Sequence, residues 1–273
     1  MSQHSEFSQE TLDAALADLP LGGLHFYPQV GSTNSAAADL SARGGSDLTV
    51  VAADEQTAGR GRQGRSWITR PGTALAVSVI LKPHSDPEQS DGRESPGRYS
   101  GLGALAAVEA LRDLYRLPAQ IKWPNDILLN HLKVGGVLVE TSWEGESLSE
   151  VILGIGLNVR KDALPEGAEF RYPAGTIAGA ADRKVDRLDL LRGLLEHLIL
   201  WRARLFSGAF LHAWERSLAF RGQKVVLAQS GQELAAGVLV GLAEDGSIKL
   251  QTGPRQIDEF PVGEIQLRPV DRS

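Results

Sequence analysis

Apolar residues recur at intervals of three and four positions in several parts of the chain, and each such pattern predicts a helix. The predicted helices cover 12–19, an alanine-rich stretch after 34, 102–117, and 188–205 with a shorter continuation to 218. Pro20 ends the first helix and a glycine pair ends the second. Ser32, Thr33 and Asn34 stand just before the second helix, so we expect their side chains to cap it.

Runs of β-branched and apolar residues between turn residues predict the strands. An apolar stretch at 24–30 comes first, and the strands before residue 160 cover 48–53, 74–81, 133–142 and 150–159. The last two are joined at Glu144-Gly145, and we expect both to be buried. After Gly222 the pattern changes to short alternating strands at 225–228, 233–242, 247–251 and 257–262, which favour a small β-barrel. We therefore expect a larger domain over 1–220 and a smaller all-β domain over 221–273.

Residues 82–100 (KPHSDPEQSDGRESPGRYS) are polar, interrupted by proline and without periodicity. Such a segment buries little apolar surface, so we expect a mobile excursion over the surface. The segment shows no pattern that indicates chemistry.

Composition narrows the class of protein. With 28 Lys and Arg against 34 Asp and Glu, the formal net charge is −6, which argues against a general surface for nucleic acids. The chain has no cysteine, which excludes disulfides and cysteine-ligated metal sites. Its apolar runs are too short for a membrane span, and its start lacks the basic and then apolar order of a secretion signal. We expect a cytoplasmic protein that makes no membrane contact.

One segment, GRGRQG at 59–64, departs from this acidic background. Its glycine spacing matches the dinucleotide-binding fingerprint, but that fingerprint opens a helix, whereas Trp67, Pro71-Gly72 and a strand follow here. RNA-binding arginine–glycine tracts are long, repeated and disordered, unlike this single loop. A solvated arginine turn stays open. The interpretation we favour is anion capture, because glycines expose backbone N–H groups and guanidinium groups bind carboxylate or phosphate.

Three other features could contact a ligand. Residues 122–126, KWPND, place a cation, an aromatic ring and an amide–carboxylate pair together. Lys133 opens a strand whose interior is apolar, which favours a ligand contact over a random surface charge. Asn158 ends another buried run, and a buried amide is costly without partners, so we expect it to be hydrogen bonded. Taken alone, Asp126 and Asn158 also fit as turn residues.

Taken together, these motifs resemble those of the biotin protein ligase family in order and spacing. They are GSTN at 31–34, DEQTAGRGRQGRSW at 54–67, KWPNDI at 122–127, KVGGVLVE at 133–140 and GIGLNV at 154–159. The resemblance implies an α+β fold: a mixed β-sheet flanked by helices, similar to class II aminoacyl-tRNA synthetases, with a small C-terminal SH3-like β-barrel. Lipoate ligases share this catalytic fold but lack the GRGRxGR loop.

The resemblance also implies residue roles. Biotin would contact Ser32, Thr33, Asn34, Gln56, Arg60, Gly61, Arg62, Lys133 and Gly135. ATP and the adenylate would contact Arg60, Arg62, Trp67, Lys122, Asn125 and Asn158, with Trp67 packed on the adenine and Asn158 reading its edge. The catalytic residues would be Arg62, Lys122, Lys133 and, with less support from the motif, Asp126. No metal ligand is expected, and the segment 171–187 is expected to touch none of these contacts.

The implied reaction has two steps. Biotin reacts with Mg²⁺-ATP to give biotinyl-5′-adenylate and pyrophosphate, and a lysine of a biotin carboxyl carrier protein then takes the biotin. Because the intermediate is hydrolysed by water, we expect the glycine-rich loop to be disordered without ligand and to close over the intermediate as a lid.

Other functions, DNA binding and the oligomeric state also have to be considered. Two alternatives stay open: a lipoyl or octanoyl transferase, and a non-catalytic sensor of biotin or nucleotide. The sensor is less favoured, because this chain has the catalytic cations and a sensor does not need them. Only 31 residues precede Ser32, so we expect no winged helix-turn-helix domain, no DNA binding and no repressor function. The sequence is compatible with a monomer or a homodimer.

Overall fold

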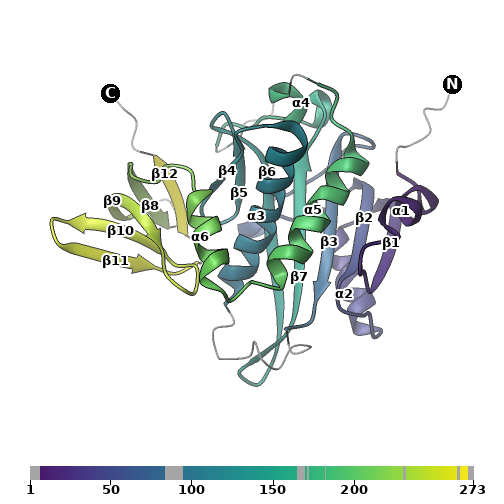
Figure 1. Ribbon diagram of the computed structural model, residues 1–273, viewed down its shortest axis with the longest axis horizontal. Coiled ribbons are helices and arrows are strands. Elements are labelled where there is room, and N and C mark those ends of the chain that lie inside the picture. The colour runs from purple at the N-terminus through teal and green to yellow at the C-terminus, as the bar shows by residue number, and fades with distance from the viewer. Residues whose placement is uncertain are drawn as a thin grey trace.

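The computed structural model describes residues 7–83, 95–164, 170, 172–181, 183–229, 232–262 and 265–269. In this part of the chain, seven strands form a central sheet in the order β1-β2-β3-β7-β6-β5-β4 (Figure 1). They are β1 Gly23–Val30, β2 Thr49–Gln56, β3 Ala74–Leu81, β4 Gln120–Lys122, β5 Asp126–Leu129, β6 Leu132–Glu144 and β7 Ser147–Asn158. β1 and β2 are parallel and the other neighbours are antiparallel, so the sheet is mixed.

Helices cover both faces of this sheet. They are α1 Gln9–Leu16, α2 Thr33–Ala42, α3 Pro96–Tyr115, α4 Ile177–Ala180, α5 Arg187–Arg202 and α6 Gly208–Arg216, with short 3₁₀ turns η1 Arg62–Gly64 and η4 Lys161–Ala163. α3 and α5 lie side by side over one face (Figure 1). α2 packs on the opposite face against β2, β3 and β7. Strands β3 and β7 therefore have helices on both faces, which explains why β3 is fully buried and almost continuously apolar.

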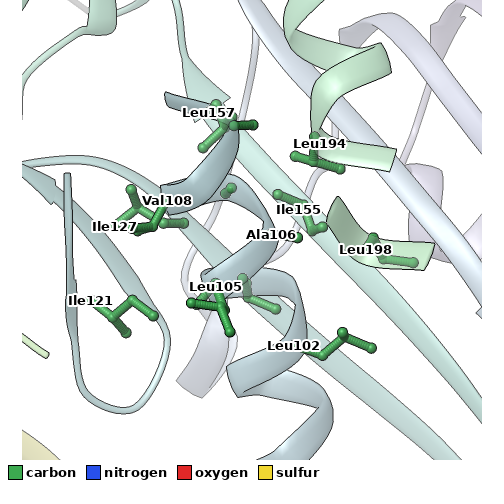
Figure 2. Packing of buried hydrophobic residues seen from close by; sticks show 14 of the residues in the cluster. Leu102, Leu105, Ala106, Val108, Ile121, Ile127, Ile155, Leu157, Leu194 and Leu198 are labelled. Atoms are coloured by element: carbon green, nitrogen blue, oxygen red, sulfur yellow. The ribbon is translucent and has the colours of Figure 1, made fainter. Parts of the chain in front are cut away.

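The main core lies between the sheet and the α3–α5 pair. Leu102, Leu105 and Val108 of α3 belong to one buried cluster with Ile155 and Leu157 of β7 (Figure 2). Each of these side chains is fully buried, and burial of one such side chain stabilises a fold by about 1.5–3 kcal/mol. Strand side chains that point to the other face of the sheet, such as Val51, form the smaller core beneath α2. This two-sided packing holds the ends of the strands in fixed positions.

A second sheet follows, with five antiparallel strands in the described residues in the order β11-β10-β9-β8-β12. The strands are β8 Lys224–Gln229, β9 Gln232–Leu242, β10 Ile248–Gly253, β11 Gln256–Phe260 and β12 Ile265–Pro269. It packs against the larger unit: the indole Nε1 of Trp123 donates a hydrogen bond of 3.0 Å to the Gly246 carbonyl. The predicted α+β fold with a small C-terminal β unit of SH3-like type is confirmed, while the domain boundary at residue 220 stays a prediction.

Several local predictions were wrong. Residues 96–100 belong to α3, whose Arg98 and Tyr99 are buried, and are not part of a surface excursion; residues 84–94 of that segment lie outside the described residues. The guanidinium of Arg98 donates to the carbonyls of Leu205 and Glu244, partners that a local polar pattern does not reveal. The outer half of β6 is half-buried to exposed. The short strands β4, β5 and β12 were not predicted.

Candidate active site

A cavity of about 970 Å³ opens where α2, the loop after β2, and strands β5, β6 and β7 meet. All but one of the site residues expected from the sequence line it: Ser32, Thr33, Asn34, Gln56, Arg60, Gly61, Arg62, Trp67, Lys122, Asn125, Asp126, Lys133 and Asn158. The exception is Gly135, which packs against Leu157 and the Gly156 carbonyl, while its neighbour Gly136 lines the cavity. The volume lies at the upper end of the range for small-molecule sites.

Positive charge is concentrated around one buried carboxylate. Asp126 at the start of β5 receives Lys122 Nζ at 3.0 Å and Lys133 Nζ at 2.5 Å, so strands β4 and β6 each bring one lysine to it. Burial raises the pKa of Asp126, but the fields of the two lysines and their hydrogen bonds outweigh burial and hold this pKa at about 2. The carboxylate therefore stays ionised at neutral pH. Two lysines against one carboxylate leave a surplus of positive charge facing the cavity.

The basic loop is attached to the same region. Arg62 Nη1 donates to Asn125 Oδ1 at 3.0 Å, and Asn125 Nδ2 donates to the Val137 carbonyl at 2.8 Å. Within the loop, Gln63 adopts a left-handed backbone with φ of 59°, which allows the tight turn of η1. The loop thus adds the Arg62 guanidinium to the cation cluster.

Neutral hydrogen-bonding groups form another part of the cavity wall. The backbone N–H and hydroxyl of Thr33 donate to Gln56 Oε1 at 2.8 and 3.0 Å. The buried Ser78 hydroxyl lies 2.8 Å from Thr33 Oγ1 and 2.6 Å from Asn34 Oδ1. Ser32 occupies the N-cap position of α2 but makes no side-chain capping bond. The prediction that this triplet caps the helix through its side chains was therefore wrong, because Thr33 and Asn34 bond to β2 and β3 instead.

Two glycines of β7 make space for cavity residues. A Cβ atom on Gly154 would lie 2.2 Å from Asn34 Oδ1, and one on Gly156 would lie 2.5 Å from Trp67 Nε1. Both approaches are far shorter than van der Waals contact, so only glycine admits the Asn34 amide and the Trp67 ring there. The buried Nε1 of Trp67 has no hydrogen-bond partner in the described residues. This leaves Trp67 with an unused donor beside the cavity.

The strand-end amide is hydrogen bonded, as its burial predicted. Asn158 Nδ2 donates to the Gly175 carbonyl at 3.2 Å. This bond ties the end of β7 to the segment that follows η4 and leads to α4. Asn158 also lines the cavity, and its role in reading adenine stays a prediction.

Sequence reasoning missed two groups of cavity residues. The first is Phe170, Tyr172, Pro173 and Ala174, and the second is Leu267 and Arg268 of β12. The Tyr172 ring centroid lies 4.7 Å from Lys122 Nζ, so the expectation that this segment touches no proposed contact was wrong. The pair of aromatic residues in a polar loop was an available signal for the first group. The second group had none, because β12 reaches the cavity only through the packing of the C-terminal sheet.

A metal site built from protein ligands alone is not found in the described ranges, where no three His, Asp or Glu side chains gather to hold an ion. The helices in these ranges also include none with the length and apolar content needed to cross a membrane.

Comparison with known proteins places this site. Residues 26–158 match the model of the biotin/lipoate A/B protein ligase family. A biotin–[acetyl-CoA-carboxylase] ligase of Paracoccus denitrificans is 34% identical over 244 residues, covering 86% of this chain and 96% of that protein. The bifunctional ligase/repressor BirA of Bacillus subtilis is 29% identical over 236 residues, which are 84% of this chain and 69% of that protein.

Solved structures agree with these relatives. The biotin protein ligase from Aquifex aeolicus in complex with biotin and ATP superimposes with a TM-score of 0.74 and 30% identity, covering 91% of this chain and 99% of that one. Since the fold and the ordered motifs coincide with those of a relative that is 34% identical over 96% of its length, the chain belongs to the biotin protein ligase family.

Proposed function

We propose that this protein joins biotin to ATP as biotinyl-5′-adenylate, releases pyrophosphate, and transfers the biotin to a lysine of a biotin carboxyl carrier protein. The observation that carries the proposal is one cavity with two chemistries: neutral hydrogen-bonding groups from α2 and β2, and a surplus of buried positive charge around Asp126. The first suits the uncharged ureido ring of biotin. The second suits a carboxylate reacting with a phosphate.

In the first step, a biotin carboxylate oxygen attacks the α-phosphorus of ATP and pyrophosphate leaves. Both reactants are anions, so the main task of the protein is to hold them in line and to neutralise the charge that develops on phosphate oxygens. Lys122, Lys133 and Arg62 line the cavity and supply this charge. Asp126, with its pKa at about 2, cannot donate a proton at neutral pH and instead fixes the positions of both lysines.

In the second step, the amine of the acceptor lysine attacks the carbonyl carbon of the mixed anhydride and AMP leaves. Water competes for the same carbon, so the loop that carries Arg60 and Arg62 has to cover the intermediate. Its attachments support this role, since Arg62 bonds to Asn125 and Arg60 forms a 3.0 Å ion pair with Glu140. No protein nucleophile is needed in either step.

Magnesium enters the proposal as part of the ATP complex. The one cavity carboxylate near the cations, Asp126, is occupied by Lys122 and Lys133, so the described side chains fit a resident ion poorly. Mg²⁺ commonly keeps its waters and binds substrate phosphates with little help from the protein. We expect the ion to be held mainly by the triphosphate.

Discrimination between biotin and lipoate follows from the neutral wall. Thr33, Asn34 and Gln56 are buried polar residues that already bond to protein groups, and a ureido ring can use their remaining donor and acceptor capacity whereas an aliphatic acid cannot. The site should therefore prefer biotin over lipoate or octanoate.

One experiment tests the function. The protein is incubated with ATP, Mg²⁺, a purified biotin carboxyl carrier domain or a lipoyl domain, and either biotin or lipoate, and mass spectrometry follows the acceptor lysine. Biotin on the carrier domain supports the proposal. Lipoate on the lipoyl domain would establish the lipoyl transferase alternative, and tight biotin binding without pyrophosphate exchange or labelling would establish a sensor.

A further inference from the structure

Glu140 on β6 does not line the cavity, yet it holds two residues that do. Its Oε2 accepts a 2.7 Å hydrogen bond from Asn34 Nδ2, and its Oε1 receives Arg60 Nη2 at 3.0 Å. Asn34 belongs to the neutral wall and Arg60 to the basic loop. The Glu140 carboxylate thus links the neutral wall, through Asn34, to the basic loop, through Arg60.

The contact with Asn34 determines which way its amide points. Asn34 Oδ1 lies 2.6 Å from the Ser78 hydroxyl, so the amide oxygen faces β3 and the nitrogen faces Glu140. Ser78 is fully buried, and the missing side chain of Gly154 leaves just the space that Asn34 Oδ1 occupies. A glutamate opposite the nitrogen can only accept, so it stabilises this orientation over the flipped one.

The contact with Arg60 is of a different kind. The guanidinium also donates from Nη1 to Ser35 Oγ at 2.8 Å, and the two side chains of the ion pair are 46% and 38% exposed. Partly exposed pairs of this kind contribute little to stability, so this one is weak enough to open and close. Glu140 therefore orders the loop without locking it.

We infer that Glu140 is a positioning residue that couples the biotin-binding wall to closure of the basic loop. This inference rests on the proposed function, and it assigns a further residue to the same site. The carboxylate presents the Asn34 amide in one orientation and draws Arg60 toward the wall. Loss of its charge should weaken biotin binding and loosen the loop, while ATP, which is held by the cation cluster, should be affected much less.

A matched control exists on the neighbouring strand. Glu150 of β7 also contacts α2, through Ser41, and also pairs with a cation, Lys82, at 2.9 Å. Glu150 and its partners do not line the cavity. Glu150→Gln therefore removes a negative charge from the same sheet, next to the same helix α2, at a position outside the cavity.

The test compares Glu140→Gln with Glu150→Gln in the full chain. Glu140→Gln should raise the KM for biotin about tenfold, the loss expected for a charge-assisted hydrogen bond, with the KM for ATP changed by less than about twofold. It should also speed hydrogen exchange in residues 59–67, and Arg60→Ala should add little in the Glu140→Gln background. Glu150→Gln should reproduce none of these changes.

Three results would overturn the inference: an unchanged KM for biotin, an equal rise in the KM for ATP, or the same loop loosening in Glu150→Gln. Failure of the proposed function is recognised separately, because the unmodified protein would then label no carrier domain with biotin. The exchange measurement needs no substrate, so it decides the coupling between Glu140 and the loop in either case.

Discussion

Two groups of buried charges lie in the larger unit, and they are built for different purposes. Asp54 at the end of β2 pairs with Arg187 at the start of α5 at 2.7 Å, both within the protein interior. Asp126 pairs with Lys122 and Lys133 at the edge of the cavity. Both groups consist of strand carboxylates neutralised by cations.

The difference lies in stoichiometry and access. In the first group one cation meets one carboxylate, and their other hydrogen-bonding groups have partners inside the protein. Asp54 Oδ1 also accepts the Gly72 N–H. Arg187 also donates to the Ala74 carbonyl and lies 4.5 Å from the Phe7 ring centroid. In the second group two cations share one carboxylate and face the cavity. A balanced, enclosed pair holds the protein together, whereas an unbalanced, accessible one binds an anion.

The largest effect should come from breaking the enclosed pair. Arg187→Leu leaves Asp54 buried without its cation, and the free energy of unfolding should fall by about 3–5 kcal/mol. Urea unfolding followed by circular dichroism measures the loss. The double variant with Asp54→Asn should recover part of it, because no unpaired charge remains. A loss below about 1 kcal/mol would show that this pair is not structural.

The accessible group should respond in activity instead of stability. Lys133→Ala should lower biotin-dependent pyrophosphate exchange by about 10²–10³-fold, as removal of a preorganised charge donor does. The urea midpoint should change little, since Asp126 keeps Lys122 as its partner. Lys249→Ala, which removes a lysine from the C-terminal sheet, serves as the control. Full activity of Lys133→Ala would exclude its proposed role.

A smaller loss of activity is expected from a change at Gly156, which makes room for the Trp67 ring beside the cavity lysines. Gly156→Ala would push the Trp67 ring away from β7, and Lys133 Nζ lies 5.9 Å from the centroid of that ring. We expect a loss of about tenfold in kcat/KM for ATP, from misplacement of side chains beside the cations. Gly208→Ala is the matched control, because no atom lies within 4 Å of its added Cβ. Equal kinetics in both variants would contradict this account of Gly156.

The smallest effect concerns a third group, which titrates near neutral pH. His197 of α5 lies 3.3 Å from Glu109 and 3.2 Å from Asp113 of α3, and the nearby Glu109 carboxylate raises the pKa of His197 above its usual value of 6.5 despite partial burial. A raised pKa in the folded state means that the charged pair stabilises the fold fully below pH 6.5 and is lost as pH rises through the folded pKa.

The free energy of unfolding should therefore decline as the pH rises above 6.5 and passes through the raised pKa of His197, by no more than about 1 kcal/mol for a partly exposed pair. His197→Gln should flatten this decline, and urea midpoints across the pH series measure it. Asp126 should add no step in this range, because its pKa is about 2. A stability that rises with pH in the unmodified protein and stays unchanged in His197→Gln would contradict the assignment.

The comparison also explains how far the sequence alone could reach. The cations of the accessible group lie in short contiguous motifs, KWPND and the strand opening at Lys133, and motifs of this kind are visible in the sequence alone. The enclosed pair went unpredicted, because Asp54 and Arg187 are far apart along the chain and each has the appearance of an ordinary surface charge. Burial of a charge depends on its partner, and a local pattern does not contain the partner.

The sequence by itself determined the family, most helices and long strands, and the set of cations and amides available to the site, since periodicity and motif spacing are local properties of the chain. Only the tertiary structure decided that two lysines share Asp126, that Asn34 turns away from capping α2 toward Ser78 and Glu140, and that Tyr172 and β12 complete the cavity wall. The contacts of Asn34, Tyr172 and β12 join segments distant in sequence, and the two lysines reach Asp126 because β4 and β6 both pair with β5 in the sheet. They exist because packing on both faces of the sheet brings the segments together, and no local pattern records that packing.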